Sequence, residues 1–574
     1  MTCKERILSN DYADIIADFQ IPEEFGFEPS IDYCYHHIEG ELGIAYVERS
    51  RLPAARTVSR SYTFLPKCYG LMENYDVKST QAGESDSSLA LMASGILSVQ
   101  GQPLSLTGKR VTIAFIDTGI QYQNKAFLDA VGRSRIRAIW DQTIQSGMPP
   151  EGFAFGTEYT REMIEEALKN PNPLSIVPTT DTNGHGTACA SIAAGSRLYE
   201  NGRFIGAAPD CDIVVVKLKE AKQYLREYYL IPEGVPCYQE NDIMLALQYV
   251  ERFVQNLYRP MVVCIGVGTS LGDHTGNTML GRYMGRIMNR KSRVIVVAAG
   301  NEGNAGHHFH GEVSQTQPFR NVELRVASGV KGFVMDFWGG VPFLFTVTVR
   351  SPGGESIEWI NPRIQRPQEF SFVFDKTILI IKYSLIEQTS GAELIRFRFE
   401  NPTEGIWTIR VNAVREVVNG NFDIWLPITQ FLSADTYFLE PDPTITLTDP
   451  SYVRRAVSAT TYNDVNNSLY GNAGRGYARD GFRKPDIAAP GVEVSTILGE
   501  RTGSSIAAAI TAGGVAQILQ WAVVEQNDIF ADSESVRNYL IRGAARESSL
   551  SYPNREWGYG RLDVQGVFEF LASV

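Results

Sequence analysis

Three polar residues of the types used in nucleophilic catalysis stand in three short, distinctive segments of the chain. Asp117 lies in VTIAFIDTGI, His185 in DTNGHGTACASIAAG and Ser505 in TGSSIAAAITAGG. A serine hydroxyl becomes a nucleophile when a histidine takes its proton, and a carboxylate can hold that histidine in the required tautomer. If the fold brings the three side chains together, they could cleave an acyl bond such as a peptide bond.

The surroundings of each residue fit this chemistry. Residues 111–116 are mostly apolar and rich in β-branched side chains, which predicts a buried parallel strand with Asp117 at its carboxyl end. His185 lies between two glycines and precedes a small-residue run, and Ser505 opens the alanine-rich run 506–512. We expect both runs to be close-packed helices. Taken singly, Asp117 is more often a turn residue and Ser505 a helix cap. Together the three favour catalysis.

The order Asp, His, Ser along the chain, with these motifs, resembles the subtilase family of serine proteases. The resemblance covers nearly all of the chain outside one insertion. The family pattern G-T-S-x-A-A-P occurs at residues 503–509, with Ser504 in place of the usual Thr and Ala509 in place of the usual Pro. Both changes are small-for-small and leave the nucleophile intact. The resemblance implies an α/β fold, a parallel sheet with helices on both faces, and serine endopeptidase activity without a cofactor or a metal ion.

A fourth element supports this interpretation. Residues 294–299 form another apolar run that predicts a strand, and Gly-Asn-Glu-Gly follows it. This segment resembles the family segment whose asparagine forms the oxyanion hole, which assigns that role to Asn301. Such an amide donor typically lowers the barrier by about 3 kcal/mol. Without the triad, Gly-Asn after a strand would be interpreted as a simple turn.

The resemblance also implies that an extended peptide substrate pairs with strand segments beside the cleft. We expect these segments at residues 267–272 and 298–300. The predicted substrate-binding residues are Gly268, Ser270, Leu271, Gly272, Ala298, Ala299 and Gly300. Their small side chains leave a slot for the residue before the cut, and apart from Glu302 nearby nothing indicates a charged specificity pocket.

The composition of the chain restricts its domain number, its partners and its cellular compartment. The chain has 574 residues, which suggests three domains, and its net charge of -12 disfavours nucleic acid as a partner. Its seven cysteines are scattered without metal-ligand spacing, and Cys189 and Cys264 stand in apolar runs where we expect them to pack as small hydrophobes. This pattern argues against an oxidising compartment. The N-terminus lacks the apolar run of a signal peptide, and we expect no membrane span. These features favour a protein that is cytoplasmic or that reaches its destination by being packaged when a cell compartment forms.

The chain divides into four segments. Residues 1–81 have the size and texture of a subtilase propeptide, a small α+β domain with a helix at 2–18 and short strands after it. A polar linker covers 73–88. Residues 82–305 and 451–574 form the two parts of the catalytic domain. The propeptide would assist folding and inhibit the enzyme; the alternative is a permanently attached domain.

Residues 306–450 interrupt the catalytic domain. They contain seven or eight short alternating segments separated by turn residues, which predicts an antiparallel β-sandwich or jelly roll. A propeptide, no signal peptide and an insertion at this position together resemble the clostridial Csp spore germination proteases. This resemblance implies a protein substrate, a cortex hydrolase zymogen, and a cleaved propeptide that stays bound as an inhibitor.

Self-cleavage is predicted between Gln81 and Ala82. The small residues after Gln81 would let the chain run extended through the cleft, and Thr80 favours the β conformation. In the Csp group the cut often follows a glutamine.

Two alternatives come from other classes. The chain could be a catalytically silent sensor or scaffold that binds a partner protein, or it could act through the sandwich as a carbohydrate-binding or scaffolding module. The intact triad and Asn301 argue against the first. An insertion tied at both ends to the core is easier to interpret as a brace than as an independent binder.

Overall fold

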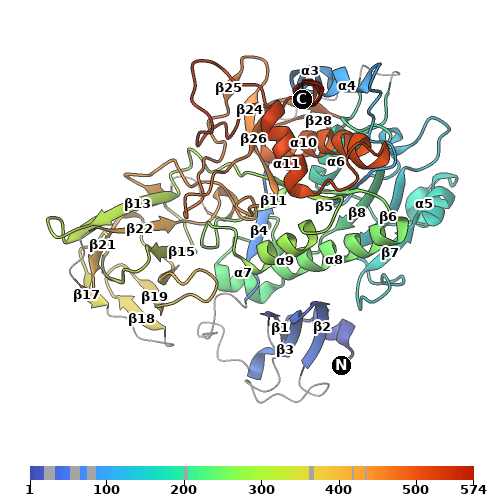
Figure 1. The fold of residues 1–574 in the computed structure, drawn as a ribbon. Coiled ribbons are helices and arrows are strands. Elements are labelled where there is room, and N and C mark those ends of the chain that lie inside the picture. The colour runs from blue at the N-terminus through green and yellow to red at the C-terminus, as the bar shows by residue number, and fades with distance from the viewer. Residues whose placement is uncertain are drawn as a thin grey trace.

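The computed structural model describes residues 1–18, 33–51, 65–73, 86–198, 204–360, 367–415, 419–432 and 436–573. Figure 1 shows a helix-covered central sheet, a small sheet at the N-terminus and a β-sandwich to one side. Gln81 and Ala82 lie outside the described residues.

The central sheet has the strand order β25-β24-β12-β10-β5-β8-β6-β7, with β26 beside β24. Its neighbours are parallel except for the β6–β7 and β24–β25 pairs at the edges. The inner strands are buried along their length, which explains their continuous apolar sequences. The strands are β5 (Thr112–Asp117), β6 (Ile136–Asp141), β7 (Thr157–Thr160), β8 (Asp212–Lys217), β10 (Met261–Ile265), β12 (Arg293–Ala298), β24 (Val457–Asn463), β25 (Ser468–Leu469) and β26 (Ile487–Pro490).

Helices cover both faces of this sheet. In β5, Ile113 and Phe115 pack into one hydrophobic cluster with α6 (His185–Ala194) and α10 (Ser504–Leu519). The alternate residues of β5 pack into a second cluster with α8 (Glu240–Leu257) and α9 (Met279–Met288). The predicted fold class is therefore confirmed. The other helices are α3 (Ser88–Ala93), α4 (Ile96–Gln100), α5 (Arg161–Leu168), α7 (Gln223–Tyr229), α11 (Ser533–Gly543) and α12 (Val564–Ala572).

The helical run 504–524 is long and apolar enough to cross a membrane by composition alone. However, 89% of its most apolar window is buried inside the protein. It contains α10, whose residues are all buried and which contacts five strands of the central sheet and α6. This run is the central helix of the catalytic core.

The N-terminal domain contains α1 (Cys3–Leu8), β1 (Tyr12–Asp18), β2 (Tyr33–Glu39) and β3 (Leu42–Glu48), in the sheet order β1-β3-β2. The prediction of one helix over residues 2–18 is wrong for its second half, because β1 pairs along its whole length with β3. Ile16 and Ile44 of these strands are fully buried in the cluster that contains α8 and α9. Tertiary packing thus decides the structure of this short apolar segment.

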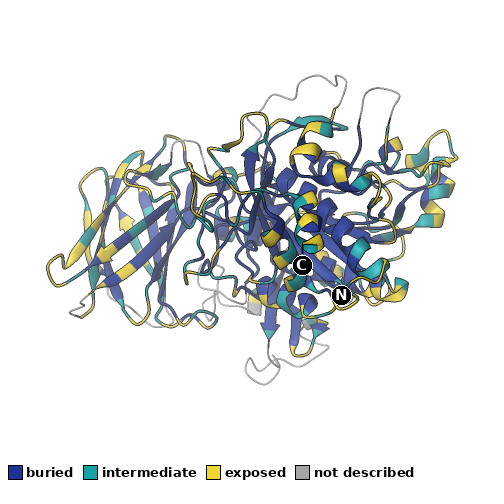
Figure 2. Cartoon of the chain, turned by 45° about the horizontal axis from the view of Figure 1, so that its top comes forward, coloured by how far each residue is buried: buried dark blue, intermediate teal, exposed yellow. Residues whose placement is uncertain are grey.

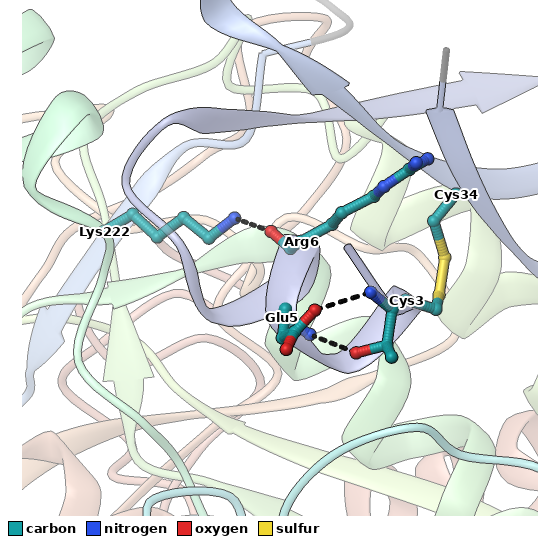
Figure 3. The surroundings of a disulfide bond; sticks show 6 residues. Cys3, Glu5, Arg6, Cys34 and Lys222 are labelled. Carbon is teal, nitrogen blue, oxygen red and sulfur yellow. Dashed lines mark hydrogen bonds between the residues drawn. A yellow bond between two sulfur atoms is a disulfide. The ribbon is translucent and has the colours of Figure 1, made fainter. Parts of the chain in front are cut away.

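A disulfide joins Cys3 of α1 to Cys34 of β2, with 5.5 Å between the Cα atoms (Figure 3). Their separation of 31 residues gave no sign of the pair in the sequence. The remaining five cysteines are free and buried, as we expected for Cys189 and Cys264. Beside the disulfide, Lys222 of the catalytic core donates a hydrogen bond to the carbonyl oxygen of Arg6 (Figure 3).

The insertion is an antiparallel sandwich of a six-stranded sheet, β13-β22-β15-β20-β19-β18, and a five-stranded sheet, β17-β16-β21-β14-β23. Large aromatic side chains such as Phe337, Phe399 and Trp407 belong to one buried hydrophobic cluster that draws residues from both sheets. Figure 2 shows buried residues along the strands of the sandwich. The sequence analysis found seven of these strands and missed β13, β17, β18 and β23. The strands are β13 (His308–Val313), β14 (Phe319–Val326), β15 (Gly332–Gly339), β16 (Phe345–Arg350), β17 (Ser356–Ile360), β18 (Gln368–Phe372), β19 (Thr377–Ser384), β20 (Leu394–Glu400), β21 (Gly405–Ala413), β22 (Gly420–Trp425) and β23 (Tyr437–Phe438).

One strand of the first hundred residues leaves the N-terminal domain. β4 (Cys68–Leu71) lies between β11 (Val267–Gly268) and β9 (Tyr238–Gln239) and is antiparallel to both. The hairpin of β27 (Val494–Thr496) and β28 (Gly499–Arg501) precedes α10. Because β11 follows the inner strand β10, β4 runs beside the carboxyl edge of the central sheet (Figure 1).

Candidate active site

The fold brings the three predicted catalytic residues together. Asp117 ends β5, His185 begins α6 and Ser505 lies in the first turn of α10. His185 Nδ1 and Asp117 Oδ1 are 2.7 Å apart and form a hydrogen bond. His185 Nε2 and Ser505 Oγ are both buried, and neither has a hydrogen-bond partner among the described residues. The hydrogen bond between a catalytic histidine and its nucleophile often forms or tightens only when substrate binds.

Gly266, directly after β10, makes this convergence possible. A Cβ at residue 266 would lie 2.9 Å from Asp117 Oδ2, 2.9 Å from His185 Cε1 and 3.3 Å from Ser505 Cβ. Any side chain here would therefore push against all three residues. The sequence analysis missed this role, although a glycine at the carboxyl end of a buried strand was a visible signal.

The oxyanion site lies at the start of α10. Asn301 Oδ1 accepts the Ser504 N–H at 3.1 Å, and the Gly300 N–H donates to Ser504 Oγ at 2.9 Å. These bonds fix the Asn301 side chain next to the nucleophile. The Ser505 N–H donates to the carbonyl oxygen of Met72 at 3.1 Å. The carbonyl group of Met72 therefore occupies the place where a scissile carbonyl would be polarised.

The residues before Met72 lie as an extended peptide in the cleft. The Met72 N–H donates to Gly266 O at 2.9 Å, and Leu71 and Gly70 pair with Val267 and Gly268 of β11. This antiparallel pairing is β-augmentation, in which an added strand completes a sheet edge. The bond next to Ser505 is therefore Met72–Glu73.

The structure places part of the segments predicted to bind substrate against residues 70–72. Gly268 pairs with β4, and a Cβ there would lie 3.1 Å from Met72 Sδ. Ala298 ends β12, Ala299 O accepts the Thr448 N–H at 3.0 Å, and Gly300 packs against the same threonine. The predicted strand 267–272 is shorter, because β11 ends at Gly268. Ser270, Leu271 and Gly272 lie beyond its paired residues.

The profile of the subtilase family matches residues 108–322 and 398–560, more than half of the chain. The chain belongs to the subtilase family. The solved structure of the CspB protease of Clostridium perfringens is similar to it, with a TM-score of 0.74 and 31% identity over 84% of this chain and 97% of that chain. Together these findings identify this subtilase as a serine-type endopeptidase.

Two further structures are more distant. The prenylagaramide maturation protease PagA has a TM-score of 0.39 and 12% identity, covering 83% of this chain and 98% of its own. The serine protease MycP1 of a type VII secretion system has a TM-score of 0.36 and 14% identity, covering 87% of this chain and 92% of its own. No curated protein sequence matches the subtilase.

The sequence analysis missed three residues around Met72 and Glu73. Arg501 of β28 pairs with Glu73, with 3.0 Å between Nη1 and Oε1. The Thr448 hydroxyl lies 3.5 Å from Met72 Sδ, and Gln430 hydrogen-bonds to the backbone of Leu71. Thr448 and Gln430 are distant in sequence from the family motifs, and Arg501, although it stands two residues before the 503–509 pattern, pairs with a residue 428 positions away. Local patterns could not reveal these contacts.

Glu302 does not form a charged pocket in this subtilase. Its carboxylate accepts hydrogen bonds from the Thr429 N–H at 3.0 Å and from the Thr429 hydroxyl at 2.9 Å. His307 Nδ1 also lies 2.9 Å from Glu302 Oε2. Glu302 therefore anchors the insertion to the oxyanion segment.

Among the described residues, one group of His, Cys, Asp and Glu side chains converges closely enough to hold a metal ion, namely Asp117, His185 and Cys189. The first two form the hydrogen-bonded pair of the triad. Burial raises the pKa of the Cys189 thiol well above its ordinary value, so the thiol stays protonated. The triad accounts for this cluster.

The charge of Asp117 sets the protonation of His185. Burial lowers the pKa of His185, but the Asp117 charge and hydrogen bond, with smaller effects of Glu73 and Asp181, raise it to about 9. The imidazolium therefore stabilises the folded protein fully below a pH of about 6.5, and this contribution is lost as the pH rises through about 9.

We expect His185 to titrate near pH 9 in the Ser505→Ala chain, where the Met72–Glu73 bond stays intact and Glu73 keeps its place. Glu73→Gln should lower this midpoint, because it removes one of the negative charges that favour the imidazolium. NMR of labelled histidine measures both midpoints. The matched control Glu534→Gln, in α11, should leave the His185 midpoint unchanged. A His185 midpoint below pH 7 in the Ser505→Ala chain would contradict the conclusion that Asp117 raises the pKa of His185.

Proposed function

We propose that Asp117, His185 and Ser505 are the catalytic triad of this subtilase, and that its first substrate is its own Met72–Glu73 bond. Ser505 attacks the Met72 carbonyl while His185 takes the hydroxyl proton and returns it to the leaving amine. Asp117 stabilises the imidazolium, and Asn301 and the Ser505 N–H hold the oxyanion. The observation that carries this proposal is the hydrogen bond from the Ser505 N–H to Met72 O.

The proposed bond differs from Gln81–Ala82, which lies outside the described residues. The Met72–Glu73 bond is favoured by contacts on both sides of the cut, namely the β4–β11 pairing before it and the Arg501–Glu73 ion pair after it. The released segment 1–72 would then be a propeptide.

The propeptide would stay bound as an inhibitor. Buried Asp14 of β1 accepts hydrogen bonds from three core side chains, Lys222 at 2.5 Å, Gln239 at 2.5 Å and Asn241 at 3.1 Å. Ile16 and Ile44 add apolar packing against the core. None of these contacts depends on the Met72–Glu73 bond.

N-terminal sequencing of the large fragment tests the self-cleavage. We expect a first residue of Glu73, because Met72 is the residue whose carbonyl contacts the Ser505 N–H. A start at Ala82 would instead support the Gln81–Ala82 bond. An uncut chain that a fluorophosphonate still labels at Ser505 would refute self-processing.

For the physiological substrate, we propose a cortex hydrolase zymogen that is activated during spore germination, with the subtilase packaged in the spore. This proposal is supported by the resemblance to the Csp proteases and the 31% identity to CspB of Clostridium perfringens. Incubation of the purified subtilase with such a zymogen should give one defined cut. The alternative of a silent sensor or scaffold predicts no cut and no labelling of Ser505.

A further inference from the structure

The insertion returns to the catalytic core along the substrate cleft. After β22, the chain passes through the short turn Thr429–Phe431 and reaches Thr448 and Asp449 beside the central sheet. Asp449 and Thr269 exchange two backbone hydrogen bonds of 3.0 and 2.9 Å. We call the two segments 428–431 and 448–449 the return wall.

The return wall is anchored to the oxyanion segment. Thr429 donates its N–H and its hydroxyl to Glu302, the residue after Asn301. Ile428 and Phe431 are buried in the same hydrophobic cluster as α6 and α10. The wall is therefore held by the catalytic core itself and is fixed relative to Ser505.

The return wall binds the backbone of the second residue before the cut. β9 pairs with β4 as far as Tyr69 and β11 pairs with Gly70 and Leu71. On Leu71, Gln430 Oε1 accepts the N–H at 3.1 Å, and Gln430 Nε2 donates to the carbonyl oxygen. The side-chain amide of Gln430 thus makes the two hydrogen bonds to Leu71 that the backbone of a neighbouring strand would otherwise make.

The return wall leaves no room for a side chain at the third residue before the cut. A Cβ on Gly70 would lie 2.6 Å from Ile428 Cδ1, 2.8 Å from Gln430 Oε1 and 3.4 Å from Phe431 Cε1. Gly70 is not among the glycines with positive φ, so the restriction is one of space. Because Ile428 and Phe431 are buried, they have little freedom to move away.

The fourth residue before the cut meets a polar group of the return wall. Tyr69 is fully buried, and its hydroxyl donates to Asp449 Oδ2 at 3.0 Å. The Thr278 hydroxyl donates to the same oxygen at 3.0 Å. A phenylalanine here would fill the pocket but would leave the buried carboxyl with one donor fewer.

We propose that the return wall determines the substrate specificity of this peptidase, selecting peptides with glycine third and tyrosine fourth before the scissile bond. The inference rests on the proposed function, in which residues 69–73 lie in the cleft as a substrate. The insertion then defines which protein is cut. A protein substrate should present the Tyr-Gly-x-x pattern of residues 69–72 in an extended segment, with the cut after the fourth residue.

The first test is Gly70→Ala in the full-length chain. Two rates are measured, cleavage of Met72–Glu73 and labelling of Ser505 by a fluorophosphonate. We expect cleavage to slow about tenfold or more, because the methyl group overlaps buried atoms. Labelling should become faster, because the displaced segment no longer fills the cleft.

A second variant separates specificity from misfolding. Ile428→Ala added to Gly70→Ala removes the closest overlapping atom, Ile428 Cδ1, and should restore both rates in part, because Gln430 Oε1 still lies 2.8 Å from the added methyl group. The matched control Gly101→Ala, whose Cβ would have its nearest contact at 3.7 Å, should change neither. Unchanged rates in Gly70→Ala, or no recovery with Ile428→Ala, would overturn the glycine requirement.

The tyrosine requirement is tested by Tyr69→Phe, for which we expect about tenfold slower cleavage. Tyr35→Phe is the control, because that hydroxyl hydrogen-bonds at an exposed site. Equal cleavage rates for Tyr69→Phe and the unchanged chain would overturn the tyrosine requirement. If the unchanged chain is not cut at Met72–Glu73, the proposed self-cleavage fails, whereas the labelling rates of the Gly70 variants still decide the role of the return wall.

Discussion

Replacing Ser505 with alanine is expected to leave the chain full length and to abolish peptidase activity. Triad residues act as a unit, so the loss in kcat should be on the order of a millionfold. The fold should not suffer, because Ser505 Oγ has no hydrogen-bond partner among the described residues. Mass spectrometry of the purified chain and a peptidase assay measure the effect.

The control for this experiment is Ser94→Ala. Ser94 follows α3, and its buried hydroxyl donates to Ala90 O at 2.7 Å. Its removal should cost about 1 kcal/mol of stability and leave self-cleavage intact. Self-cleavage of the Ser505→Ala chain at the rate of the unchanged chain would show that another group is the nucleophile.

Gly266→Ala is expected to have the second-largest effect. The added methyl group would contact Asp117, His185 and Ser505 at 3.3 Å or less, so the triad must spread. Displacements of about 1 Å at a catalytic site cost about a hundredfold in rate, and here three groups are displaced together. We therefore expect self-cleavage to slow by at least about a hundredfold, in a chain that still folds.

Gly285→Ala is the matched control. A Cβ at this position in α9 has no atom within 4 Å, and the helix should gain slightly from the alanine. Thermal unfolding compares the stability of both variants, and fluorophosphonate labelling reports on Ser505. A Gly266→Ala chain that cuts itself as fast as the Gly285→Ala chain would show that the triad tolerates the methyl group.

Local sequence was sufficient to predict Asp117, His185 and Ser505, which the fold brings together, and the strands and helices that carry them. Asp117 and Asn301 follow short apolar runs that predict buried strands, and Ser505 begins a run too small and too apolar for a surface helix. In parallel sheets, the carboxyl ends of neighbouring strands meet at one edge. These features depend on residues close together in the sequence, so the apolar pattern and the polar residue types indicate the same site.

Other features depend on contacts between distant segments, which local pattern does not contain. Residues 12–18 form a strand because β3 pairs with them, and Cys3 reaches Cys34 because the N-terminal sheet brings α1 and β2 together. The strand β4 leaves its own domain because the edge of β11 and β9 accepts it. Its composition is compatible with either place.

The substrate cleft shows the same division most clearly. The sequence predicted Ser505 as the nucleophile and the segment 267–272 beside it, and only the first residues of that segment pair with β4. The tertiary structure decided which bond lies next to Ser505, and it brought Arg501 to Glu73 and Gln430 to Leu71 across separations of 428 and 359 residues. Short motifs reveal catalytic chemistry because that chemistry needs particular residue types. Specificity arises instead from surfaces that many residue types can form once the chain has folded.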